Sequence, residues 1–184
     1  MPVKYRMDSA GSRFTVQAFA TGLLSTFGHN PTIGMRDYQG ELQFEPDTYE
    51  GALVRVTVRT GTMEVLDEMK SDDRKKLEQM MYDEVLEVAR FPDAVYESNS
   101  ITVQKLDTNL LQAHVTGQLT FHGMTQSESF DARVTDMGGM LRISGEFSLR
   151  QSDYGIKPVS FAAGALRLKD ELKFKYELIA RKQE

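Results

Sequence analysis

Alternation of apolar and polar residues with a period of two is the feature that most constrains how this chain folds. The clearest stretch has polar neighbours between Leu111, Ala113, Val115, Gly117, Leu119 and Phe121. Successive side chains of a β-strand point to opposite faces, so this stretch predicts a long strand with one buried face. The same pattern recurs at residues 14–18, 38–44, 54–58, 130–134, 141–147 and 172–178.

The segments between these stretches are typical of turns between strands. They include Glu45-Pro46-Asp47, His122-Gly123-Met124-Thr125 and Asp136-Met137-Gly138-Gly139. Together they predict at least seven strands joined by hairpins in an all-β fold. Such strands close either as a sandwich or as a barrel, and the alternation alone does not choose between the two.

One segment, from Ser71 to Ala89, has a helical pattern instead. Its apolar residues recur every three or four positions, and Ser71 is suited to be the N-cap. We expect a helix or a pair of helices that ends before Phe91-Pro92.

Length and composition narrow the classes of function. The 184 residues suit a single domain spanning residues 1–184. The net charge of -5 gives no attraction for nucleic acid or an anionic membrane surface, and the absence of cysteine excludes disulfides and thiolate chemistry. No apolar run is long enough to span a bilayer, and the first residues lack a secretory signal. We therefore expect a soluble, cytoplasmic protein, or a periplasmic one if a leader was removed.

Five segments, in order along the chain, resemble those of the YceI family of lipocalin-like, polyisoprenoid-binding proteins. They are Asp8–Phe14, Tyr38–Phe44, Phe91-Pro92 with Tyr96-Glu97-Ser98, Val115–Thr125 and Ser152–Ile156. The resemblance implies an eight-stranded antiparallel barrel with a helical insertion at about residues 71–89. It also implies an isoprenoid chain in an elongated internal pore, and eight strands can enclose one small ligand.

The inward-facing apolar residues are the candidate ligand-binding set. By pattern alone they could equally form a closed core, and the resemblance favours a cavity. The set is Phe14, Val16, Tyr38, Leu42, Phe44, Val54, Val56, Tyr96, Leu119, Phe121, Phe147, Phe174 and Tyr176.

The segment Leu23–Pro31 departs from the family pattern, which usually continues the second strand into V-K-H. We expect this segment to form part of the barrel mouth, with His29 and Asn30 either in turns or in contact with ligand. If the ligand has an anionic head group, Arg36 is the candidate cation.

No motif for catalysis, phosphate binding or metal binding is present, so we predict no catalytic residue, no cofactor and no metal site. The parity of His114 and His122 places both on the outer surface. At about 3.3 Å per residue they are too far apart to share a metal ion.

The leading hypothesis is a non-catalytic carrier that holds an isoprenoid, quinone-like or other lipid-like amphiphile. One alternative is a small hydrolase or isomerase that uses His29 on a hydrophobic substrate. Another is an interaction module whose barrel is filled by its own side chains. Edge strands at an imperfectly closed seam would allow a homodimer.

Overall fold

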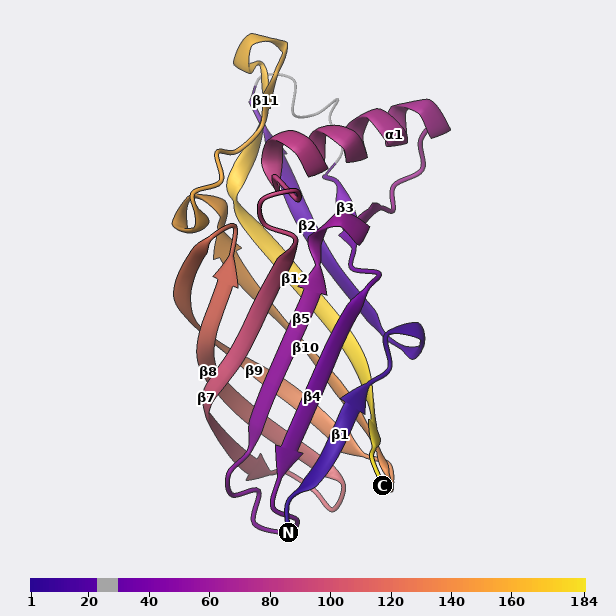
Figure 1. Cartoon of the computed structure of the whole chain (residues 1–184), viewed down its shortest axis with the longest axis vertical. Helices are drawn as coiled ribbons and strands as arrows, with labels where there is room; N and C mark the ends of the chain where they lie inside the picture. The colour runs from indigo at the N-terminus through magenta and orange to yellow at the C-terminus, as the bar shows by residue number, and fades with distance from the viewer. Residues whose placement is uncertain (23–29) are drawn as a thin grey trace.

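The chain forms a closed antiparallel β-barrel, as the resemblance to the YceI family implied (Figure 1). The structure is a computed structural model and describes residues 1–22 and 30–184. The eight strands of the barrel wall follow in their order around it. They are β1 (Val3–Met7), β4 (Tyr38–Phe44), β5 (Leu53–Arg59), β7 (Asp93–Lys105), β8 (Leu110–Phe121), β9 (Met124–Asp136), β10 (Met140–Arg150) and β12 (Leu166–Lys182).

Four further strands pair with this wall or with one another, and one α-helix lies outside the sheet. β2 (Arg13–Thr21) pairs with β12, β3 (Thr32–Gly34) with β2, β6 (Glu64–Val65) with β3, and β11 (Ser160–Phe161) with β12. The helix α1 (Ser71–Met80) lies across one end of the barrel, and both termini lie at the other end (Figure 1). Short 3-10 turns occur at Ser9–Gly11, Thr60–Thr62, Gln151–Tyr154 and Ala162–Gly164.

The long strand β12 closes the barrel. Its C-terminal end pairs with β1, where Ala180 is opposite Met7, and an earlier part pairs with β2, where Phe174 is opposite Val16. Between β1 and β2, Asp8 accepts a hydrogen bond from the backbone of Gly11 and forms an ion pair of 3.0 Å with Arg181. Its bond to Arg181 is the main reason why the pKa of Asp8 lies below its usual range.

The alternation predicted for β8 is present in the structure. Leu111, Ala113, Val115 and Phe121 are buried, and Val115 is opposite Phe130 of β9. Each predicted strand lies within an observed one, and the turns at 45–47, 122–123 and 137–139 join neighbouring strands.

The helical segment differs from the prediction. Lys70, not Ser71, is the N-cap of α1, and no side chain caps the helix. The α-helix ends at Met80 and continues as a π-helical turn, Met81–Val85. Glu87 has a φ of 46°, in the left-handed region, so the helical path cannot continue to Ala89.

Candidate ligand-binding cavity

A cavity of about 610 Å³ lies inside the barrel. All eight strands of the wall contribute lining residues, for example Met7 from β1, Val56 from β5 and Leu178 from β12. The apolar faces produced by the alternation therefore meet around an open space and do not fill it. The volume falls within the range of about 300–1,000 Å³ that is usual for small-molecule sites.

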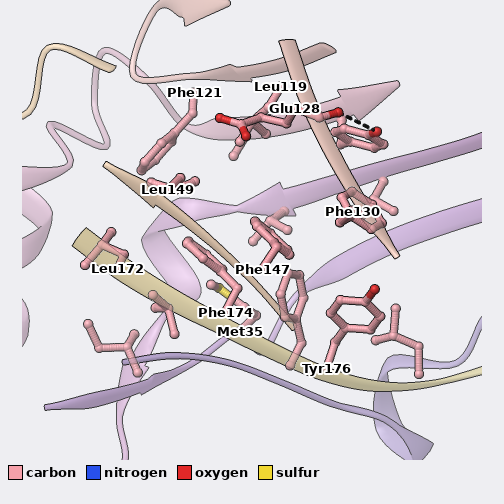
Figure 2. Close-up of a pocket in the computed structure, with 18 of the residues that line it drawn as sticks. Met35, Leu119, Phe121, Glu128, Phe130, Phe147, Leu149, Leu172, Phe174 and Tyr176 are labelled. Atoms are coloured by element: carbon pink, nitrogen blue, oxygen red, sulfur yellow. Dashed lines mark hydrogen bonds between the residues drawn. The ribbon is translucent and has the colours of Figure 1, made fainter. Parts of the chain in front are cut away.

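Aromatic rings form one wall of the cavity (Figure 2). Phe147 stacks on Phe174 with ring centroids 4.7 Å apart, and on Phe130 at 5.3 Å. Phe14 and Tyr176 pack against this group at 6.3 Å from each other. These rings come from β2, β9, β10 and β12 and pack against one another. The wall therefore presents a rigid apolar surface.

Methionines gather at the end of the cavity that α1 covers. The lining there includes Met69, which precedes α1, and Met80 and Met81, which end it, together with Met63 and Leu77. The methionine side chain is unbranched and flexible, so it adapts to ligands of different shape. Leu77, Met80 and Met81 belong to the helical pattern of the sequence, but none of these residues was predicted to line the cavity.

Two inward tyrosines donate hydrogen bonds to the backbone of β9. The Tyr96 hydroxyl donates to the carbonyl of Glu128 and the Tyr176 hydroxyl to that of Asp131, each at 3.2 Å. Burial raises the pKa of Tyr96 to about 12 and raises that of Tyr176 as well. Both phenols therefore stay protonated and act as donors near neutral pH.

The two glycines that face these hydroxyls leave the room they need. A Cβ on Gly117 would lie 2.7 Å from the Tyr96 hydroxyl, and one on Gly145 would lie 2.3 Å from the Tyr176 hydroxyl. The inward positions of β8 and β10 thus accommodate a neighbouring tyrosine instead of a side chain of their own.

Glu128 brings a carboxylate into this apolar interior (Figure 2). It lies on the inward face of β9, opposite Gly117. Its Oε1 accepts a hydrogen bond of 2.6 Å from the hydroxyl of Tyr154, a side chain with no exposed surface. Burial raises the pKa of Tyr154, and the neighbouring Glu128 raises it further, so the phenol remains a donor. Glu128 was not among the residues predicted to lie inside the barrel.

The structure places twelve of the thirteen predicted interior residues in the cavity lining. Tyr38 is the exception. It is buried and packs edge-to-face on Phe14 with ring centroids 5.8 Å apart, outside the lining. That these residues bind a ligand stays a prediction.

The two predicted mouth residues that the structure describes, Asn30 and Arg36, do not line the cavity. His29 lies outside the described residues. The Asn30 side chain accepts a hydrogen bond from the backbone of Ala20 in β2 at 2.9 Å. Arg36 is exposed, forms an ion pair of 2.5 Å with Glu64 and does not line the cavity, so its placement does not support a role in ligand binding.

The prediction for the two described histidines holds for only one of them. His114 is exposed and lies 2.8 Å from Asp131. His122 keeps only 10% of its side chain exposed, because its φ of 50° turns the side chain between Phe91, with ring centroids 4.5 Å apart, and Glu87, whose carboxylate is 2.9 Å from Nε2. Among residues 1–22 and 30–184, no group of histidines and carboxylates is arranged to hold a metal ion.

The sequence pattern of the YceI-like domain matches residues 5–180 of this chain. The chain belongs to the YceI family. A UPF0312 protein of Pseudomonas fluorescens is 26% identical over 164 residues, which cover 85% of this YceI-like chain and 78% of the relative. Protein YceI of Salmonella arizonae is 23% identical over 169 residues, covering 91% and 74% of the two chains.

Solved structures share the fold of this YceI-like domain. BcnA of Burkholderia cenocepacia superposes with a TM-score of 0.73 at 15% identity, covering 94% of this chain and 98% of BcnA. A polyisoprenoid binding domain from Saccharophagus degradans gives a TM-score of 0.71 at 12% identity, covering 97% and 98%. Within the described part of the chain, no helix has the length and apolar character needed to cross a membrane.

Proposed function

We propose that this protein binds an isoprenoid, quinone-like or other lipid-like amphiphile in its barrel and carries it without catalysis. The observation that supports this proposal is the cavity of about 610 Å³, with its aromatic wall and methionine-rich end. The structural similarity to a polyisoprenoid binding domain agrees with such a ligand.

Desolvation supplies the binding energy in this proposal. Each CH₂ group that leaves water for an apolar site contributes about 0.8 kcal/mol, so a long chain needs few polar contacts. The flexible methionines beside α1 would adjust to the chain as it enters.

The two alternatives fare differently. A filled barrel would have no cavity, and the observed cavity argues against it. A hydrolase or isomerase would depend on His29, which lies outside the described residues. We propose against that activity because the described part of the lining has no histidine, serine or cysteine, so its carboxylates have no hydroxyl or thiol nucleophile of that kind to activate.

Native mass spectrometry of the purified protein, followed by organic extraction, tests the proposal. We expect an additional mass that corresponds to an extractable lipid. Recovery of no lipid, together with turnover of hydrophobic esters by the protein, would favour the hydrolase instead.

Filling the cavity supplies a matched variant. Val115→Phe adds a ring on the inward face of β8, whereas Gln118→Phe adds the same ring on the outward face. We expect Val115→Phe to weaken geranylgeraniol binding at least tenfold, which lowers the stabilisation by saturating ligand by about 1.4 kcal/mol, and Gln118→Phe to leave it unchanged. Thermal melts with and without geranylgeraniol measure how much the ligand stabilises each variant. Equal losses of this stabilisation in the two variants would place the ligand outside the barrel.

A further inference from the structure

Glu128 is a polar group in a cavity that is otherwise suited to hydrocarbon. Its Oε1 is bonded to Tyr154 at 2.6 Å, and its backbone carbonyl accepts from Tyr96. The hydrogen bonds among the described residues do not include Oε2. A half-buried carboxylate that lines an apolar cavity favours hydrogen-bond donors for its remaining lone pairs, so a ligand that brings a donor is favoured at this point.

The other charged residues of the lining have the same sign. Asp67 and Glu68 lie beside α1, and Asp136 ends β9. No lysine, arginine or histidine lines the cavity in the described part of the chain, and residues 23–29 contain one histidine, His29, and no lysine or arginine. Arg74 reaches only the backbone carbonyl of Asp67, at 2.8 Å, and does not line the cavity.

We propose that the ligand carries an uncharged head group that donates a hydrogen bond, an alcohol in the simplest case, and that Glu128 Oε2 accepts it. This inference rests on the proposed function and specifies the chemical class of the amphiphile. It also excludes the anionic head group for which Arg36 was the candidate cation.

The charge of the head group should decide which amphiphile binds, because the site is of low polarity. A phosphate or carboxylate head group would lie near acidic side chains, and no lysine, arginine or histidine of the described lining is there to pair with it, which is strongly unfavourable. An ether of the same length keeps the hydrophobic gain but leaves the carboxylate without its second donor. A hydrogen bond to a charged group is stronger than a neutral one, so this loss should exceed tenfold in affinity.

Three probes with the same prenyl chain separate these cases on the unaltered protein. They are geranylgeraniol, its methyl ether and geranylgeranyl phosphate, and their dissociation constants are measured by titration calorimetry with detergent controls. We expect the alcohol to bind at least tenfold more tightly than the ether, and the phosphate to bind most weakly.

Variants of Glu128 then assign the effect to this residue. Glu128→Leu should bring the alcohol down to the affinity of the ether, because no acceptor remains. Glu128→Gln keeps an amide oxygen as acceptor and removes the charge, so binding of the phosphate should improve at least tenfold. Glu177→Gln makes the same charge change on the exposed outer face of β12 and should alter none of the three affinities.

The outcomes distinguish this inference from the proposed function. Equal binding of the three probes, or tightest binding of the phosphate, would overturn the head-group assignment and leave the lipid carrier intact. Binding of none of them would overturn both. Because the comparison of probes needs no variant, the test does not depend on whether the Glu128 variants fold.

Discussion

Gly117→Ala is expected to destabilise the barrel by about 3 kcal/mol, the upper part of the usual range for overpacking. The new methyl group would lie 2.3 Å from the carbonyl oxygen of Glu97 and 2.7 Å from the Cα of Ser98. Both atoms belong to the backbone of β7, so relief requires the strands to separate. Denaturant unfolding followed by circular dichroism measures the loss.

Gly61→Ala is the control for this substitution. A Cβ at Gly61 meets only the side chain of Val88, at 3.9 Å, an ordinary contact distance. Its change in the free energy of unfolding should stay within about 0.5 kcal/mol. If the two alanine variants were equally stable, the close approach of β7 to β8 at Gly117 would be wrong.

Leu119→Asp should lower the free energy of unfolding by about 3 kcal/mol or more, because it puts a carboxylate without a partner into the apolar interior. Leu119 lines the cavity and is opposite Gln126 on β9, two residues from Glu128. The new charge therefore also repels an existing one on the same face of the sheet. Urea unfolding at neutral pH measures the effect.

The neighbouring substitution Gln118→Asp tests the register. Gln118 is exposed on the outward face, opposite Glu97, which is already paired with Arg55 at 3.2 Å. Its cost should stay within about 0.5 kcal/mol. Losses of similar size for the two aspartate variants would show that the inward and outward faces of β8 are assigned wrongly.

The sequence was sufficient to predict a strand and its buried face where the alternation is uninterrupted. In β8 every second residue from Leu111 to Phe121 faces the interior, so both the strand and its buried face could be predicted. In β7 the register shifts between Ser98 and Ser100, and the inward residues change from Ala94 and Tyr96 to Ile101 and Val103. A bulge of this kind reverses the parity, which hides a long strand from a pattern of period two.

Other parts could not be predicted for local reasons. The strands β3 and β6 are too short to show any period, and the left-handed backbone at Glu87 and His122 gave no signal in the sequence. Glu128 was missed because Ser127, Glu128 and Ser129 are polar on both faces of β9. Extending the parity of Phe130 by two residues would have placed it inside.

The dependence of binding on chain length tests the central claim, that the barrel encloses a lipid-like chain, most directly. A thermal-shift series with geraniol, farnesol, geranylgeraniol and longer prenyl alcohols measures it, because a ligand that binds only the folded state raises the melting temperature. Each isoprene unit that leaves water adds to the affinity until the cavity of about 610 Å³ is full. We predict a shift that climbs along the series and then levels off, whereas a flat response over the whole series would contradict the account.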